Sequence, residues 1–162
     1  MKTAIIYGTL KGTTEKAAHL LENQLPSEVN LINVKEEKPI NLAGYDTVIL
    51  GSSIYAGNVQ EKMKKFIHTY QQELLSKKLG LYICCMYEGD KAMQQFEMAY
   101  PQQLRSHAVA SGLFGGELHF AKMNMFEKLI VKIVQKVEGN KTVAANFSEE
   151  AIEKFASRFI KN

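Results

Sequence analysis

Apolar and polar positions follow two different periods along this chain, and the two periods alternate. Short runs of aliphatic and aromatic residues bounded by turn residues indicate buried strands. Apolar residues three and four positions apart indicate helices with one buried side. The runs predict strands at 3–7, 28–33, 47–51, 79–86 and 109–118. The helical spacing predicts helices at 14–25, 59–70, 92–104, 124–137 and 148–160, the third interrupted at Pro101.

This alternation predicts an α/β protein with a doubly wound, five-stranded parallel sheet and helices on both faces. At 162 residues one domain is expected, spanning residues 1–162. Ligands of such sheets bind beyond the carboxyl ends of the strands, so the loops at 8–14, 52–58 and 86–91 and the chain after Leu118 are the candidate site. The sheet has enough helices without 124–137, and we therefore expect an inserted amphipathic helix at about 119–141.

The loop between the first strand and the first helix has the composition of an anion site. Its residues are mostly small or hydroxylated: Gly8, Thr9, Leu10, Lys11, Gly12, Thr13 and Thr14. A helix N-terminus offers unpaired N–H groups and partial positive charge, so a phosphate held there needs no cationic side chain. A plain strand–turn–helix with a threonine N-cap remains an alternative. The spacing excludes both the dinucleotide fingerprint and the P-loop.

The next two loops each combine an aromatic residue with glycine. The second loop contains Ser53, Ile54, Tyr55, Ala56 and Gly57, and the third contains Met86, Tyr87, Glu88 and Gly89. The two tyrosines could cover opposite faces of a flat ring, where offset stacking adds roughly 0.5–1.5 kcal/mol beyond burial. Gly57 permits a backbone group to turn toward the ring. The alternatives are a βα turn with one exposed tyrosine and a turn with an N-cap at Asp90.

Composition indicates in which cellular compartment the protein is expected. No apolar run approaches the roughly 20 residues of a membrane span, and the first strand begins too early to leave room for a signal peptide. Cys84 and Cys85 are expected to be buried free thiols in a reducing cytosol. Of the four histidines only His119 is expected at the ligand edge, and no catalytic residue, metal site or nucleic-acid partner is predicted.

The net charge of +3 is concentrated in one segment. Residues 119–141 contain five lysines and two glutamates, whereas the rest of the chain is balanced. Apolar residues occupy one side of the predicted helix in this segment: Met125, Phe126, Leu129, Ile130, Ile133, Val134 and Val137. Either the helix packs on the sheet, or residues 122–137 offer the apolar side to a membrane surface or a greasy substrate.

The first segment also resembles a known cofactor signature. Ile5-Ile6-Tyr7, Thr9, Gly12, Thr14 and Ala18 are similar to the FMN-phosphate signature of flavodoxins. The resemblance implies the strand order 2-1-3-4-5 and FMN as cofactor, bound by the residues 9–14, 53–57 and 86–89 named above. Flavodoxin shuttles are usually strongly acidic, which opposes reduction of the flavin, so this basic chain is expected to resist reduction less.

Three longer stretches resemble one branch of these FMN proteins. MKTAIIYGTLKGTTEKAA, GSSIYAGNVQEKMKKFI and MFEKLIVKIVQKVEG look like the menaquinone-dependent protoporphyrinogen oxidases of heme biosynthesis. That resemblance implies an FMN-dependent oxidoreductase that passes electrons from an apolar donor, such as a porphyrinogen, to quinone at the inner face of the cell membrane. The alternatives are a cytoplasmic electron-transfer protein that docks on redox partner proteins, and a protein of this fold without flavin.

Overall fold

The computed structural model describes residues 1–36, 38–118, 120–138 and 147–160, and it confirms the predicted α/β class. The parallel sheet is built from β1 (Lys2–Gly8), β2 (Glu28–Asn33), β3 (Thr47–Tyr55), β5 (Lys78–Cys84) and β6 (Ala110–Leu113). Their spatial order is β2–β1–β3–β5–β6, and every neighbouring pair is parallel. β4 (Asn58–Val59) lies off this path as a two-residue partner of β3, so β5 and β6 are the fourth and fifth strands of the parallel sheet. The expected order 2-1-3-4-5 is therefore confirmed.

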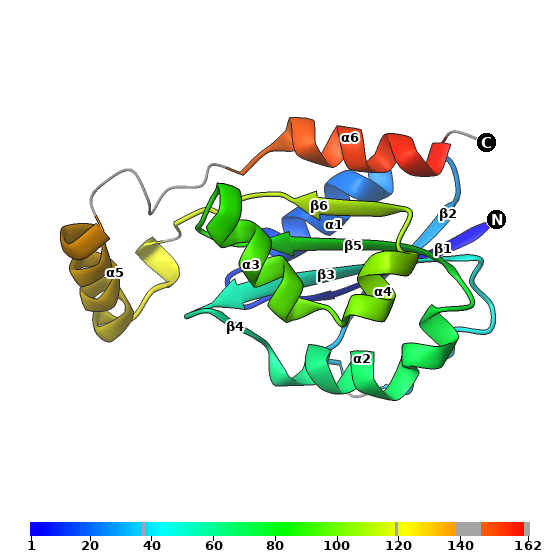
Figure 1. Cartoon of the computed structure of the whole chain (residues 1–162), viewed down its shortest axis with the longest axis horizontal. Helices are drawn as coiled ribbons and strands as arrows, with labels where there is room; N and C mark the ends of the chain where they lie inside the picture. Colours follow the sequence, from blue (N-terminus) through cyan, green and yellow to red (C-terminus); the bar gives the residue numbers. More distant parts are fainter. Residues whose placement is uncertain (37, 119, 139–146, 161–162) are drawn as a thin grey trace.

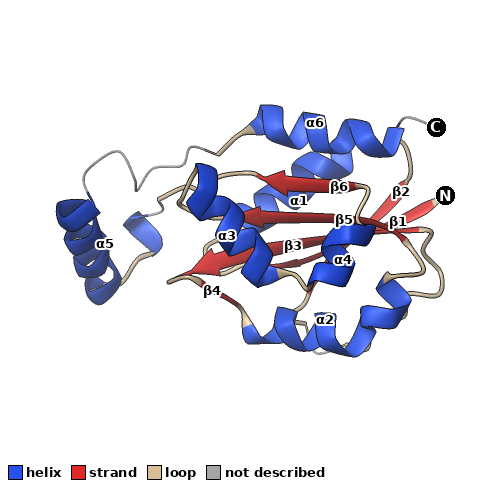
Figure 2. Ribbon diagram, viewed as in Figure 1, coloured by secondary structure: helices blue, strands red, loops and turns tan. Residues whose placement is uncertain are grey.

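Helices cover both faces of the sheet (Figures 1 and 2). One face packs against α2 (Glu61–Leu74), α3 (Gly89–Ala99) and α4 (Gln102–His107), and the other against α1 (Thr13–Gln24) and α6 (Glu149–Ile160). Strand periodicity explains the two cores: Ile6 belongs to the first cluster, whereas Ile5 and Tyr7 belong to the second. The predicted interruption at Pro101 is confirmed, since Pro101 separates α3 from α4.

The third strand is longer than the sequence predicts. Residues 52–58 were expected to form a loop, but β3 continues to Tyr55 and turns back into β4. The turn residues Ala56 and Gly57 have φ angles of 48° and 76°. Positive φ at both central positions is the geometry of a two-residue hairpin whose twist matches its strands. Backbone pairing therefore extends a segment that polar Ser52 and Ser53 seemed to end.

The last strand is shorter than predicted. β6 ends at Leu113 rather than Leu118, as expected where glycine interrupts a strand. Gly115 has a φ angle of 75°, and its carbonyl accepts a hydrogen bond from the Cys85 amide. A Cβ on Gly116 would lie 2.7 Å from the Met86 sulfur and 2.9 Å from the Cys85 carbonyl oxygen. The chain after β6 therefore presses directly against the loop that follows β5.

The inserted segment stands apart from the two helical layers. It consists of a short 3₁₀ helix, η1 (Phe120–Lys122), and α5 (Met125–Glu138), which lies beyond the carboxyl ends of the strands (Figure 1). The alternative that this helix packs on the sheet is wrong, because Met125 is 89% exposed, Phe126 70% and Val137 78%. None of the helices in the described ranges has both the length and the apolar character needed to cross a bilayer.

Candidate functional site

A pocket of about 470 Å³ lies where the loops at the strand ends meet the inserted segment. Ten of the fifteen predicted site residues line it: Leu10, Lys11, Thr13, Ser53, Ile54, Tyr55, Ala56, Gly57, Met86 and Tyr87. Three loops that are far apart in the sequence are therefore brought together, as parallel strands require of their carboxyl ends. The other five predicted residues do not line the pocket: Thr9, Gly12, Thr14, Glu88 and Gly89.

The loop between β1 and α1 is shaped by Gly12, which has a φ angle of 98° and occupies the N-cap position. The predicted alternative of a threonine N-cap is therefore wrong, since α1 begins with no side-chain cap hydrogen bond. Thr9 instead supports the turn, because its hydroxyl oxygen accepts a hydrogen bond of 2.9 Å from the Gly12 amide. An uncapped helix start of this kind retains the N–H donors that bind anions.

Thr14 adds a second feature that fits an anion. Its side chain is fully buried, and its hydroxyl interacts with the Cys84 thiol but has no oxygen or nitrogen partner within the described part of the chain. A thiol is a weak hydrogen-bond partner, so a buried hydroxyl with no better one in the first turn of α1 is unusual. Its place beside an uncapped helix start agrees with the chemistry of a phosphate group, which supplies acceptor oxygens.

Two lysine ammonium groups also lie at this loop, although a phosphate at a helix N-terminus was not expected to need a cationic side chain. The Lys122 ammonium donates a hydrogen bond of 3.1 Å to the Lys11 carbonyl and lies 3.3 Å from where a Cβ on Gly12 would be. The Lys11 ammonium donates to the Lys122 carbonyl at 2.9 Å. The inserted segment is thus joined to the loop by reciprocal contacts, and it adds positive charge to an anion-binding helix start.

The loop after β5 places Met86 and Tyr87 on the pocket wall. The Lys91 ammonium lies 5.1 Å from the centre of the Tyr87 ring, within the range of a cation–π contact. Glu88 is the N-cap of α3, and Gly89 with a φ angle of 57° is its first residue. The expectation of an N-cap at Asp90 is therefore wrong by two positions, because the helix starts earlier than its apolar spacing indicates.

The two adjacent cysteines also line the pocket, which the sequence analysis missed. Both are buried free thiols, as predicted. Burial raises the pKa of Cys84 to about 12, and burial also raises the pKa of Cys85 above its ordinary value. Both side chains therefore remain neutral thiols at physiological pH, and they contribute apolar wall rather than a nucleophile.

The inserted segment supplies another part of the pocket wall through Met123, Glu127, Ile130 and Val131. None of these four was among the predicted cofactor-binding residues, although the chain after Leu118 was expected to lie at the site. A signal for one of them was present, because Asn124-x-x-Glu127 fits a helix-start capping pattern. The structure shows both bonds of that pattern: the Asn124 amide donates to the Glu127 carboxylate at 3.0 Å, and the Glu127 amide donates to the Asn124 side-chain oxygen at 2.8 Å.

Glu127 also reaches back to the predicted loops. Its carboxylate accepts a hydrogen bond of 3.0 Å from the Lys11 ammonium and one of 2.9 Å from the Tyr55 hydroxyl. The Lys11 hydrogen bond, followed by the Asn124 amide and the Tyr55 hydroxyl, holds the pKa of Glu127 below its usual value. Partial burial and the bond to Glu127 raise the pKa of Tyr55. Tyr55 remains 39% exposed, so its ring is accessible on the pocket side.

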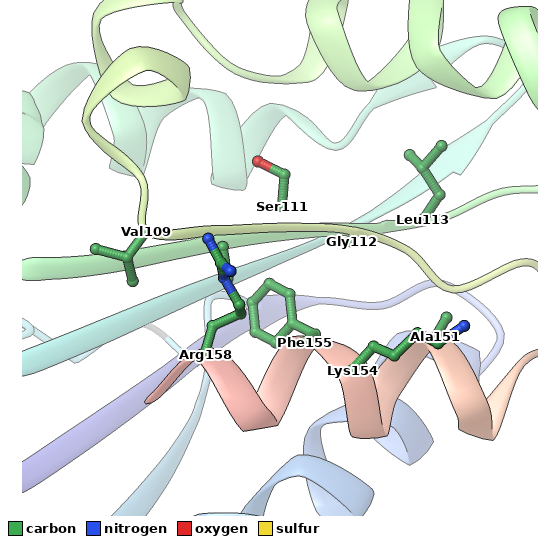
Figure 3. A pocket seen from close by; sticks show the side chains of 9 residues that line it. Val109, Ser111, Gly112, Leu113, Ala151, Lys154, Phe155 and Arg158 are labelled. Atoms are coloured by element: carbon green, nitrogen blue, oxygen red, sulfur yellow. The ribbon is translucent and has the colours of Figure 1, made fainter. Parts of the chain in front are cut away.

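The three histidines in the described ranges do not line the pocket. His19, His68 and His107 are exposed, as expected, and His119 lies outside the described residues. A second cavity of about 420 Å³ lies at the β6 edge of the sheet, between β6 and α6 (Figure 3). It shares no lining residue with the first pocket and contains no predicted site residue.

Comparisons with known proteins agree with this architecture. The sequence profile of the family described as "Flavodoxin domain" matches residues 4–144. The protoporphyrinogen IX dehydrogenase [quinone] of Leishmania major is 22% identical over 171 residues, covering 98% of this chain and 74% of that protein. Oxidised flavodoxin 1 from Bacillus cereus superposes with a TM-score of 0.60 at 17% identity, covering 100% and 99% of the two chains. The flavodoxin of Streptococcus pneumoniae TIGR4 gives a TM-score of 0.58 at 16% identity, covering 99% and 98%.

Proposed function

Because this chain belongs to the flavodoxin domain family, we propose that it binds FMN in the strand-end pocket and passes electrons from an apolar donor to a quinone. FMN supplies a ring that accepts and returns two electrons. The family supports the choice of cofactor. The uncapped start of α1 and the buried Thr14 hydroxyl, which interacts only with the Cys84 thiol in the described structure, agree with its phosphate.

The proposed cofactor contacts divide between the loops. Residues 9–14 hold the phosphate: Thr9 shapes the turn, Gly12 allows its positive φ, and Lys11, Thr13 and Thr14 supply donors near it. The hairpin 53–57 and the residues 86–89 enclose the ring, with Tyr55 and Tyr87 on the pocket wall. The neutral Cys84 and Cys85 exclude water from one side. In this arrangement the described residues bind and orient the ring.

The observation that favours a quinone oxidoreductase over a soluble shuttle is the position of α5. Ile130 and Val131 line the pocket, while Met125, Phe126 and Val137 on the same helix are largely exposed. A surface with several large apolar side chains and neighbouring lysines is typical of contact with a lipid surface. An apolar electron acceptor dissolved in the lipid would then approach the pocket along α5.

The similarity to the Leishmania major protein supports the same direction, with a porphyrinogen as the donor. The second candidate is a cytoplasmic electron-transfer protein that docks on redox partners. It is favoured by the flavodoxins of similar fold. In that case the exposed face of α5 would meet a partner protein instead of lipid.

Two linked experiments test the proposal. The purified protein loaded with FMN should show a bound-flavin visible spectrum, and it should bind riboflavin, which lacks the phosphate, far more weakly. Anaerobic assays with a porphyrinogen as donor and a menaquinone analogue as acceptor should then show turnover that depends on FMN. Equal affinity for FMN and riboflavin would remove the phosphate site. FMN binding without turnover would favour the electron-transfer candidate.

A further inference from the structure

One carboxylate joins three segments that are far apart in the sequence. Glu127 accepts hydrogen bonds from the Lys11 ammonium on one oxygen and from the Tyr55 hydroxyl on the other. Lys11 belongs to the loop before α1, Tyr55 ends β3, and Glu127 lies in the first turn of α5. The two side chains that Glu127 contacts both line the pocket. The contact therefore connects the inserted segment to the two loops proposed to hold the phosphate and the ring.

The surroundings distinguish this contact from seven other ion pairs of the described residues. The side chains of Lys11 and Glu127 are 24% and 15% exposed, whereas each of those seven pairs includes a partner that is at least 47% exposed. Exposed pairs contribute little to structure because water screens them and both side chains must be ordered. The Lys11–Glu127 pair is more enclosed, and its carboxylate also accepts from Tyr55 and Asn124, so it fixes the positions of its side chains more strongly.

We propose that Glu127 is a positioning residue of the cofactor site, which holds the Tyr55 ring and the Lys11 ammonium in place for the flavin. This inference rests on the proposed binding of FMN. A tyrosine ring turns about two side-chain torsions, and its hydroxyl oxygen lies on the axis of the second. A hydrogen bond to the hydroxyl therefore restricts chiefly the first torsion, which places the ring, and stacking on a flat ligand depends on that placement. The insertion thus forms part of the cofactor site as well as an outer surface.

The same contact links the occupancy of the site to the placement of α5. If Glu127 orients groups that bind the flavin, then bound flavin must favour the docked position of α5 to the same extent, because such coupling is reciprocal. The simpler role for Glu127 is to cap α5 through Asn124. A cap stabilises the helix but leaves Tyr55 and Lys11 unaffected. The two roles therefore predict different results for variants.

A double-mutant cycle between Glu127→Ala and Tyr55→Phe tests the proposal. Tyr55→Phe keeps the ring and removes only the hydroxyl that Glu127 holds. Stacking on Tyr55 should quench the fluorescence of bound FMN. Each single variant should raise the dissociation constant of FMN by roughly 3- to 10-fold and restore part of the fluorescence lost on binding. The double variant should be no worse than Glu127→Ala alone, because Glu127→Ala already removes the contact that Tyr55→Phe removes. Glu127→Gln should recover part of the effect, since its amide oxygen still accepts from Tyr55.

Two variants serve as controls. Asn124→Ala removes the side-chain cap of α5 but keeps the contacts of Glu127 with the loops. Glu61→Ala removes a glutamate from the first turn of α2, away from the pocket. Neither should change the emission of bound FMN. If Glu127→Ala behaves like Asn124→Ala, or if the cycle is additive, Glu127 is only a capping residue and the proposal is wrong.

The cycle can also be read without the cofactor, which separates this proposal from the proposed function. Amide hydrogen exchange in α5 of the FMN-free protein should quicken in Tyr55→Phe and more strongly in Glu127→Ala, and the double variant should exchange no faster than Glu127→Ala. If the free-energy changes obtained from exchange are additive, the positioning role is wrong even if FMN binds. If FMN does not bind but exchange is non-additive, the proposed function fails while the contact itself stands.

Discussion

The sheet and the inserted segment use apolar side chains in opposite ways. In the sheet region Ile5, Ile49 and Phe155 are almost fully buried between β1, β3 and α6. In α5 Phe126 is 70% exposed and Leu129 53%, although the helix is as amphipathic as its sequence predicts. An apolar stripe therefore predicts a helix with one greasy side, but it does not say what covers that side. The apolar face of α5 is therefore exposed and available for contact with another surface, whereas the apolar side chains of the sheet form the core that holds the fold together.

The largest expected effect comes from the same substitution in the two regions. Phe155→Ala should lower the free energy of unfolding by about 3–5 kcal/mol, because it leaves a cavity beside Phe114 and Phe159. Phe126→Ala should change it by less than about 0.5 kcal/mol, because that ring is mostly solvated. Denaturant unfolding of the cofactor-free protein measures both. Similar losses for the two variants would mean that α5 packs into a core in solution.

The sequence predicted the sheet well and the site in part, and the reasons are physical. The parallel sheet followed from the alternation of elements, its strand order followed from the resemblance to flavodoxins, and the strand ends then placed Leu10, Ile54 and Met86 on one pocket. The contacts of Glu127 and Lys122 with the loop before α1 could not be predicted, because no local pattern fixes where an insertion folds back. The hairpin at Ala56 was missed for another reason: its positive φ lies at an alanine, where hairpin turns normally have asparagine, aspartate or glycine.

A second test exploits the charge that accompanies the exposed face of α5. Changing Lys128, Lys132 and Lys136 to glutamine should weaken binding to anionic vesicles by about 3 kcal/mol, at about 1 kcal/mol for each lysine near the surface. FMN should remain bound. The matched control changes Lys62, Lys64 and Lys65 of α2 to glutamine, which removes the same charge from the other region. Sedimentation with vesicles at increasing salt measures both, and equal losses would mean that only net charge matters.

A third test concerns the hydroxyl in the first turn of α1. Thr14→Val should weaken FMN binding by about 1.5–3 kcal/mol, the usual contribution of a hydrogen bond to a charged group. Riboflavin binding should change much less, because riboflavin has no phosphate. Thr47→Val is a close control, since Thr47 is also buried and its hydroxyl has no partner in the described structure, but it begins β3 at the far end. Titration of flavin fluorescence measures the affinities, and equal effects at the two threonines would contradict a phosphate contact.

The smallest expected effect lies at the tip of the hairpin. Ala56 has a φ angle of 48°, a conformation that costs an alanine roughly 1–2 kcal/mol and that asparagine adopts more readily. Ala56→Asn should therefore raise the stability of the cofactor-free protein by up to about 1 kcal/mol. The midpoint of thermal unfolding measures the change. A loss of stability would show that the turn does not keep this conformation in solution.

The most direct test asks whether α5 connects the flavin site to a lipid-borne acceptor. The FMN-loaded protein is reduced, then mixed without oxygen either with menaquinone in anionic vesicles or with a water-soluble menaquinone analogue. We predict rapid reoxidation by both acceptors in the wild type. In the variant with glutamine at positions 128, 132 and 136, reoxidation by the vesicles should slow strongly while that by the soluble analogue is unchanged. Equal rates of vesicle-driven reoxidation in the two proteins, or no such reoxidation in the wild type, would contradict the proposed function.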